Sequence, residues 1–201
     1  MTQVFDEVGR VVPVTVIEAG PCHVVQVKSL DKDGYAAVQL GFGDVKPKHV
    51  TKPLKGHFDH AGVPARKWLR EFHVATDEEY HVGQIIAVDT FAPGDKVDVT
   101  ATSLGKGFQG VIKRHHFRRG PTTHGSKYHR RVGSLGASSD PSRVFKGRRL
   151  PGRMGSKQRT VQNLTVVRSD PERNLLLVKG SVPGRRGAFV MVRSTNKMIS
   201  R

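Results

Sequence analysis

Short runs rich in β-branched and aromatic residues recur towards both ends of the chain and are separated by turn-forming residues. Such runs have the length and composition of β-strands, and Gly20-Pro21 and Asp33-Gly34 mark two of the turns. The predicted strands cover residues 11–19, 23–29, 35–42, 66–74, 83–91, 96–104, 160–169, 174–182 and 188–194. Residues 52–63 favour one short helix.

Apolar and polar residues alternate in the sequence VDVTAT of residues 97–102. This period of two is typical of a strand that is buried on one face only. Several short strands with turns between them predict a mainly β fold, either a small barrel or a sandwich.

Residues 105–160 follow neither the helical nor the strand period. They contain ten glycines and isolated apolar residues such as Val111 and Ile112. Because predicted strands resume after this segment, it is an insertion between core elements and not a tail. A structureless loop of this length within a compact domain is typical of a functional segment. We therefore predict a body formed by residues 1–104 and 161–201, with an inserted extension at 105–160.

Composition limits the class of protein. A chain of 201 residues is long enough for one domain with a core, or for a small domain plus an extension. The single cysteine, Cys22, excludes an internal disulfide and suits a reducing compartment. The chain opens with no signal-peptide pattern and has no apolar run of membrane-spanning length. We therefore predict a cytoplasmic protein.

The distribution of charge changes this picture more than its total does. The formal net charge is +17, and residues 105–160 alone hold 15 basic side chains and one acidic side chain. Residues 1–104 have a net charge of −3, and residues 161–201 have a net charge of +6. Repulsion between its cations prevents the extension from packing in the absence of a partner. It predicts a polyanionic partner, either nucleic acid or an acidic membrane surface.

The densest part of the extension is KRHHFRRGPTTHGSKYHRR at residues 113–131, with seven Lys or Arg, four His and no carboxylate. The histidines His115, His116, His124 and His129 do not predict a metal site. Adjacent histidines do not easily face one ion, the flanking cations would repel it, and no thiolate or carboxylate lies nearby in sequence. We predict neither a metal nor a cofactor.

Catalytic motifs are weak or missing. GKGFQG at residues 105–110 matches the G-x-G-x-x-G pattern, but the next acidic residue, Asp140, lies thirty positions after Gly110, and no second parallel strand intervenes. No G-x-S-x-G elbow is present, and the basic segment has a single carboxylate, Asp140, so it has no pair of acids for catalysis. We therefore predict that the protein is not an enzyme. The alternatives are a nucleic-acid-modifying enzyme that uses the histidines, and a membrane-surface protein, which would need an amphipathic helix that the sequence lacks.

RNA binding explains the residue types of the extension. Arginine pairs with phosphate through a planar fork, and lysine supplies point charges. Phe108, Phe117, Tyr128 and Phe145 are interleaved with these cations and are suited to stacking on unpaired bases. Alternatively, Phe108 and Phe145 anchor the extension on small apolar clusters of its own. No recognition helix for duplex DNA is predicted.

The predicted RNA-binding residues are the cations and histidines of the extension: Lys106, Lys113, Arg114, His115, His116, Arg118, Arg119, His124, Lys127, His129, Arg130, Arg131, Arg143, Lys146, Arg148, Arg149, Arg153, Lys157 and Arg159.

Four parts of the chain resemble the large-subunit ribosomal protein L3 family in its bacterial form. They are MTQVFDEVGRVVPVTVIEAGPC at the start, TSLGKGFQGVIKRHHFRRGPTTHGS in the middle, RVFKGRRLPGRMGSKQRTVQNLTVV, and NLLLVKGSVPG. The resemblance implies a small closed β-barrel body and a long, largely irregular basic extension inserted between strands. It implies a structural protein that binds the large rRNA, helps to nucleate subunit assembly, and reaches towards the peptidyl transferase centre.

The resemblance also implies partners and positions. The partners are large-subunit rRNA and neighbouring ribosomal proteins, with no membrane, no small-molecule substrate and no homo-oligomer. The residues expected at the extension's tip, nearest the catalytic RNA, are Leu150, Pro151, Gly152, Arg153 and Met154.

Two departures from the family pattern carry expectations of their own. Many members have a short lead of the GxKxGMT type before this start, so the chain is expected to begin late or to lack a first strand. Some bacterial members have a glutamine that can be methylated where this sequence has Arg153. That modification is not available here, and a direct phosphate contact is expected instead.

Overall fold

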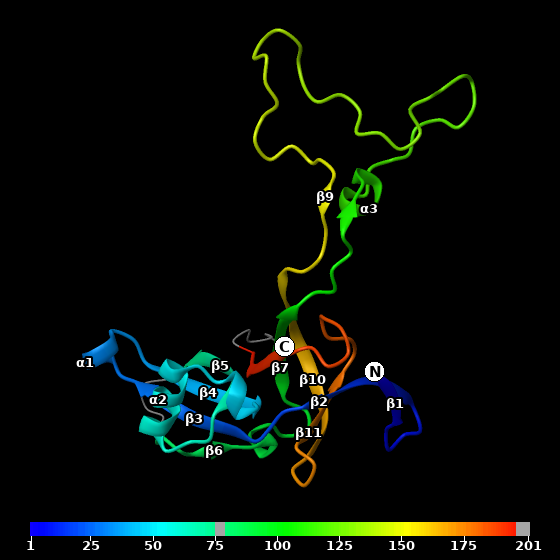
Figure 1. Ribbon diagram of the computed structural model, residues 1–201. Helices are drawn as coiled ribbons and strands as arrows, with labels where there is room; N and C mark the ends of the chain where they lie inside the picture. Colours follow the sequence, from blue (N-terminus) through cyan, green and yellow to red (C-terminus); the bar gives the residue numbers. More distant parts are fainter. Residues whose placement is uncertain (75–78, 196–201) are drawn as a thin grey trace. The chain divides into compact units, whose positions relative to one another are not determined.

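The computed structural model of the protein describes residues 1–74 and 79–195, and Figure 1 shows their secondary structure. The strands are β1 (Thr2–Phe5), β2 (Val11–Glu18), β3 (Cys22–Lys28), β4 (Ala37–Asp44), β5 (Arg66–His73), β6 (Ile85–Ile86), β7 (Lys96–Thr102), β8 (Phe108–Gln109), β9 (Gly152–Arg153), β10 (Gln158–Asp170), β11 (Leu175–Lys179) and β12 (Val190–Ser194). The helices are α1 (Leu30–Asp33), α2 (Lys52–Ala61) and α3 (Val111–His115), with 3-10 turns η1 (Pro47–His49) and η2 (Val88–Thr90). No helix in this part of the chain is long and apolar enough to cross a membrane.

The strands form three sheets, which confirms the mainly β class. One sheet has the order β1-β2-β11-β10-β7-β12, a second has the order β5-β4-β3-β6, and β8 pairs with β9 alone. Within residues 1–74 and 79–195, no sheet has a strand order that returns to its first strand, so each is open. Closure of the body into a barrel, as expected from the family resemblance, is therefore not confirmed.

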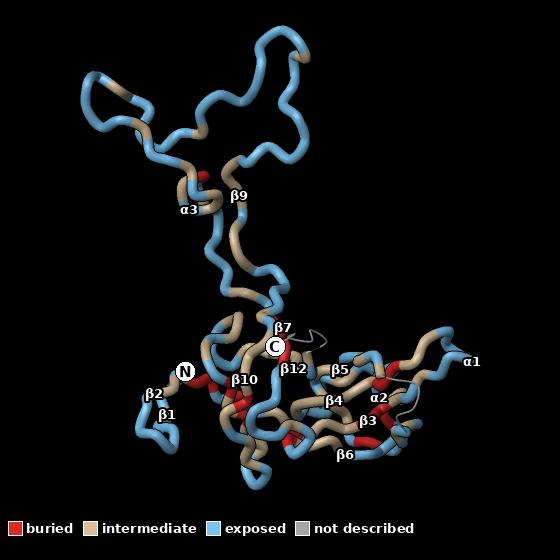
Figure 2. Tube along the Cα trace, turned by 180° about the vertical axis from the view of Figure 1, so that it is seen from behind, coloured by how far each residue is buried: buried red, intermediate tan, exposed pale blue. Residues whose placement is uncertain are grey.

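Antiparallel pairing of β2 with β11 brings apolar side chains together in the larger sheet. Leu176 lies opposite Ile17, and Leu176 and Val178 are fully buried in β11, whereas Leu175 and Leu177 are only partly buried and Lys179 is exposed. Such alternation places one face of the strand in the core. Figure 2 shows the buried residues gathered on these strands and on the β3–β4 pair.

Strand β7 differs from its prediction. The alternating sequence predicted one buried face, but all residues from Val97 to Ala101 are buried, including Asp98 and Thr100. β7 lies between β10 and β12, and Asp98 lies 3.9 Å from Arg193 of β12. The hydroxyl groups of Thr100 and Thr160 share a hydrogen bond at 2.7 Å, which satisfies this buried polar side chain.

The smaller sheet carries helix α2. Phe58 of α2 is 2% exposed, and the helix contacts β3. Helix α2 ends at Gly62, whose φ of 63° is the left-handed conformation that favours glycine. The helix predicted at residues 52–63 is therefore confirmed.

One strand prediction is wrong for most of its length. Of residues 83–91, only Ile85–Ile86 form a strand, which pairs with Cys22 and His23 of β3. The chain then enters the turn η2, where the Thr90 hydroxyl donates to the carbonyl of Ala87 at 3.0 Å.

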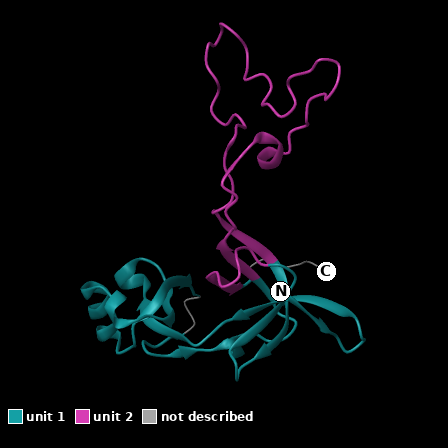
Figure 3. Ribbon diagram, turned by 45° about the vertical axis from the view of Figure 1, so that its right-hand side comes forward, with its two compact units in different colours: residues 1–97, 163–181, 194–201 teal, residues 98–162, 182–193 magenta. Residues whose placement is uncertain are grey.

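The chain divides into two compact units, which Figure 3 shows in different colours. Unit 1 comprises residues 1–97, 163–181 and 194–201, and unit 2 comprises residues 98–162 and 182–193. Unit 2 therefore contains the whole segment that the sequence marks as the basic extension.

Candidate nucleic-acid interface

Two antiparallel chain segments in unit 2 are joined by backbone hydrogen bonds. The amide of Ser103 donates to the carbonyl of Lys157 at 2.9 Å. Further along, the amide of Lys106 donates to Met154, and the amide of Met154 donates to Gly107, both at 2.9 Å. These bonds give the extension a ladder that does not depend on side-chain burial.

The ladder continues through β8 and β9, where Phe108 lies opposite Arg153 and Gln109 opposite Gly152. We call residues 103–115 and 150–157 the stem. The segment that joins its two arms, residues 116–149, we call the outer loop.

Close approach of the two arms requires a glycine at position 155. Gly155 has φ of 76°, and a Cβ atom there would lie 2.1 Å from the carbonyl oxygen of Leu104. No side chain fits in that space. This glycine therefore sets how closely the two arms run together.

Helix α3 closes the stem where the outer loop leaves it. It contains Val111, which is 1% exposed. Arg114 Nη1 donates to the carbonyl oxygen of Leu150 at 2.6 Å, and His115 Nε2 lies 3.1 Å from the same oxygen. The helix was missed from the sequence because it is only five residues long and these contacts come from a segment distant in sequence.

The outer loop is held by few contacts of its own. The amide of Gly120 donates to the carbonyl of His129 at 3.0 Å, and His129 Nδ1 lies 2.9 Å from the carbonyl oxygen of Pro121. Arg148 donates to the carbonyl of Ser134. Figure 2 shows the loop exposed over nearly its whole length.

Aromatic rings lie among these cations. Arg131 stacks over the ring of Tyr128 at 5.5 Å, and Arg143 over that of Phe145 at 5.4 Å. Phe145 is 59% exposed and Phe108 is 76% exposed. The alternative in which Phe108 and Phe145 anchor the extension in apolar clusters is therefore wrong, and both rings are open to an aromatic partner such as a base.

The predicted RNA-binding residues fall into three places. Those in the outer loop are His116, Arg118, Arg119, His124, Lys127, His129, Arg130, Arg131, Arg143, Lys146, Arg148 and Arg149. Those in the stem are Lys106, Lys113, Arg114, His115, Arg153 and Lys157, and Arg159 lies in β10. All are exposed except Arg114 and His115, which are half-buried against Leu150. RNA contact by each of them stays a prediction.

The residues expected at the tip lie within the stem. Gly152 and Arg153 form β9, and Leu150 accepts the bonds from α3. The outer loop closes the extension beyond them. Their predicted place beside the catalytic RNA stays a prediction.

Almost all of the net positive charge lies in unit 2. Unit 2 holds 18 basic and 2 acidic side chains, a net charge of +16, whereas unit 1 holds 16 and 15, a net charge of +1. In the described part of the chain, the ion pairs are Lys28–Glu71, Arg66–Asp44 and Arg193–Asp98, and none uses a cation of residues 105–160. The cations of the extension therefore form no ion pair with a carboxylate of the described residues.

Unit 2 also contains a segment that the sequence predicts as part of the body and not of the extension. Residues 182–193 carry Arg185, Arg186 and Arg193. The signal that could have found them is the run PGRRG, whose glycine-flanked arginines resemble KGRRLPGRMG at residues 146–155.

Two histidines of the extension have hydrogen-bond partners within it. His115 and His129 contact backbone carbonyl oxygens. Across residues 1–74 and 79–195, no three His, Cys, Asp or Glu side chains come together as a candidate metal site.

Two comparisons place the chain among known proteins. Residues 67–173 match the family model described as ribosomal protein L3. The large ribosomal subunit protein uL3 of Carboxydothermus hydrogenoformans is 60% identical over 197 residues, which cover 98% of this chain and 94% of that protein.

Proposed function

The chain belongs to the ribosomal protein L3 family, and from this premise we propose that it is a structural constituent of the large ribosomal subunit whose unit 2 binds large-subunit rRNA. The observation that carries the proposal is the charge division, because a net charge of +16 lies in one unit. Exposed cations without internal carboxylate partners are the feature that phosphate groups neutralise.

The construction of unit 2 supports binding by shape and charge. The stem supplies a ladder of backbone hydrogen bonds, and the outer loop adds exposed arginines, lysines and aromatic rings. Single-stranded and irregular RNA offers both phosphates and unstacked bases to such a surface. Binding then orders the outer loop, because phosphates relieve the repulsion between its cations.

The face of the stem at β8 and β9 suits a close RNA contact. Phe108 and Arg153 are opposite each other in the pairing, and both are exposed. Cross-strand partners lie about 4.5–5.5 Å apart at their Cβ atoms, so a ring and a guanidinium are available to one nucleotide. We propose that residues 150–154 contact rRNA near the peptidyl transferase centre and that Arg153 binds phosphate there.

The remaining parts of the proposal follow from membership of the family. The protein acts in translation, within the ribosome of the cytoplasm, beside other large-subunit proteins, and it helps to nucleate assembly of the subunit. It performs no catalysis, uses no cofactor, and does not form a homo-oligomer.

The experiment that tests this function is a titration of the purified protein against a transcript of bacterial large-subunit rRNA at several salt concentrations. Each neutralised phosphate contributes about −0.7 to −0.9 to the slope of log affinity against log salt. Ten or more phosphate contacts would give a slope of about −7 or steeper. Affinity that stays constant across these salt concentrations would contradict the proposal, and crosslinking with nucleotide mapping would identify the contacts.

A further inference from the structure

A loop outside the extension carries two arginines in the same compact unit. Residues 182–189, which we call the arginine loop, have the sequence VPGRRGAF and lie between β11 and β12. Both Arg185 and Arg186 are exposed. The loop belongs to unit 2, together with the stem.

Glycine holds the arginine loop close to the base of the stem. Gly184 has φ of 107°, and a Cβ atom there would lie 3.1 Å from the carbonyl oxygen of Thr102. Thr102 directly precedes Ser103, the residue that bonds Lys157 at the start of the stem. The approach of Gly184 to Thr102 therefore fixes where the two arginines begin.

The conformation of the arginine loop is also restrained on its other side. The amide of Ala188 donates to the carbonyl of Arg185 at 3.0 Å, and Gly187 has φ of 69°. Two left-handed glycines and a turn hydrogen bond thus enclose the arginine pair. Such a turn presents both side chains at a defined place and not on a free tail.

The local charge makes this place a continuation of the cationic surface. Residues 182–193 contain no acidic residue, and the acids of unit 2 are Asp98 and Asp140. Asp98 is 2% exposed and lies 3.9 Å from Arg193. It is therefore not on the surface where Arg185 and Arg186 are exposed.

We propose that the arginine loop is a further rRNA-binding site, in which Arg185 and Arg186 bind phosphate groups at the base of the stem. This inference rests on the proposed function of unit 2. The loop approaches the chain where Lys157 and Ser103 begin the stem, so one polyanion that follows the stem meets both. Arginine forks suit phosphate oxygens better than a point charge does.

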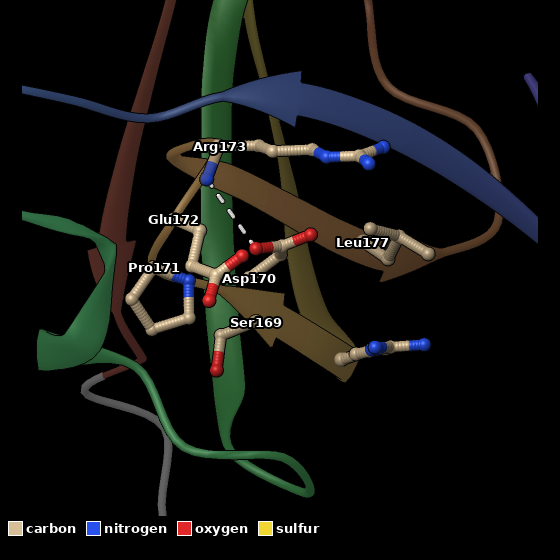
Figure 4. Close-up of a pocket in the computed structure, with 7 residues that line it drawn as sticks. Ser169, Asp170, Pro171, Glu172, Arg173 and Leu177 are labelled. Carbon is tan, nitrogen blue, oxygen red and sulfur yellow. Dashed lines mark hydrogen bonds between the residues drawn. The ribbon is translucent and has the colours of Figure 1, made fainter.

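The test compares two variants of the full chain that lose the same number of arginines. One variant carries Arg185→Ala and Arg186→Ala. The matched control carries Arg168→Ala and Arg173→Ala in unit 1, where Figure 4 shows Asp170 and Glu172 in the same turn and Asp170 Oδ1 accepts the Arg173 amide at 3.3 Å. Both control arginines are exposed, but Arg173 lies in the turn with these carboxylates and Arg168 lies in β10, two residues before Asp170.

The measurement is the salt dependence of affinity for a transcript of bacterial large-subunit rRNA. Loss of two phosphate contacts reduces the magnitude of the slope by about 1.4 to 1.8 in the loop variant, and the control keeps the slope of the unchanged protein. A third variant, Arg185→Lys with Arg186→Lys, keeps both charges and therefore keeps most of the slope. Circular dichroism and thermal unfolding show that all three variants remain folded.

The possible outcomes distinguish failure of the arginine-loop site from failure of the proposed function of unit 2. If the loop variant and the unchanged protein have the same slope while alanines at Arg148, Arg149 and Arg153 reduce it, the arginine loop does not bind rRNA. Loss of a crosslink to a neighbouring protein, with the rRNA slope unchanged, would likewise overturn the site in favour of a protein contact. If the unchanged protein itself shows no dependence on salt, the proposed function fails, and this inference fails with it.

Discussion

Arg114 donates a hydrogen bond to the backbone carbonyl of Leu150 at 2.6 Å, although 36 residues separate them in sequence. The bond joins helix α3 to the opposite arm of the stem at the point where the outer loop begins. One cation that the sequence predicts for RNA contact thus has a role within the protein as well.

Replacing Arg114 by Ala should loosen the end of the stem. A hydrogen bond from a charged donor contributes about 1.5–3 kcal/mol, so amide exchange in residues 107–115 should accelerate by about ten-fold to a hundred-fold. Hydrogen exchange read by mass spectrometry measures this directly. Arg130→Ala removes an exposed cation of the outer loop and serves as the control. Equal acceleration in both variants would show that the loss of charge, and not of this bond, loosens the stem.

Gly155→Ala should disrupt the stem more than Gly107→Ala does. Both glycines have positive φ, 76° and 67°, so both substitutions incur the left-handed penalty of about 1–2 kcal/mol. Only at Gly155 would the new Cβ atom also meet a backbone oxygen, that of Leu104 at 2.1 Å, while nothing lies within 4 Å at Gly107. Exchange of the Lys106 amide, which bonds Met154, reports the difference. Similar protection of that amide in the two variants would mean that the contact between Gly155 and Leu104 does not affect the stability of the stem.

Alanines at Arg148, Arg149 and Arg153 should weaken rRNA binding without unfolding unit 1. Loss of three phosphate contacts reduces the magnitude of the salt slope by about 2 to 3. The three side chains are exposed, and none belongs to the buried core, so the β signal in circular dichroism should be retained. The matching triple Lys variant preserves the charges and should keep the slope. Loss of the β signal in the Ala variant would contradict the separation of the extension from the body.

The sequence predicts best those strands whose own residues identify them without tertiary contacts. Residues 11–19 and 66–74 differ from β2 and β5 by one residue at the C-terminal end, because runs of β-branched and aromatic residues are visible locally. Burial of both faces of β7 could not be predicted, since Asp98 and Thr100 are polar and their partners, Arg193 and Thr160, are distant in sequence.

The same division applies to the candidate interface. Composition alone predicts the cations of the extension, because charge can be counted along the chain. The run PGRRG could have marked Arg185 and Arg186 as candidates, but their place in the same unit as the stem depends on contacts across the fold, such as the approach of Gly184 to Thr102. Helix α3 is held in a similar way, by the contacts of Arg114 and His115 with Leu150.

Leu176→Ala should destabilise unit 1 by about 2–5 kcal/mol, the usual range for a buried leucine. Leu176 is fully buried in β11 and lies opposite Ile17 of β2. Urea unfolding followed by circular dichroism measures the change. Val16→Ala is the control, because Val16 is 44% exposed and its loss should cost less than about 1 kcal/mol. A similar effect of the two substitutions would contradict the assignment of Leu176 to the core.

A polar network on the smaller sheet gives the protein a dependence on pH. Lys28 Nζ lies 2.9 Å from Glu71 Oε1, the Tyr35 hydroxyl donates to Glu71 Oε2 at 3.0 Å, and Gln39 donates to Oε1 at 3.2 Å. The bond from Lys28 and then the bond from Tyr35 hold the pKa of the Glu71 carboxyl below its ordinary value near 4.5. The charged form is thus the one that the fold stabilises.

Glu71→Gln should remove a contribution to stability that depends on pH in a defined direction. A carboxyl whose pKa is lowered by folding stabilises the protein above its ordinary pKa, and this stabilisation is lost as the pH falls through the lowered value. The free energy of unfolding of the unchanged protein should therefore exceed that of the variant at neutral pH, and the difference should shrink below about pH 4.5. Tyr35→Phe, which removes one donor and keeps Lys28, should give a smaller difference of the same sign. Urea unfolding at a series of pH values measures the free energy of unfolding of both variants. Below its lowered pKa the Glu71 carboxyl is neutral in the folded and the unfolded chain alike, so its contribution disappears there. A difference in unfolding free energy between the unchanged protein and Glu71→Gln that stays constant down to pH 3 would show that these neighbours do not stabilise the ionised Glu71.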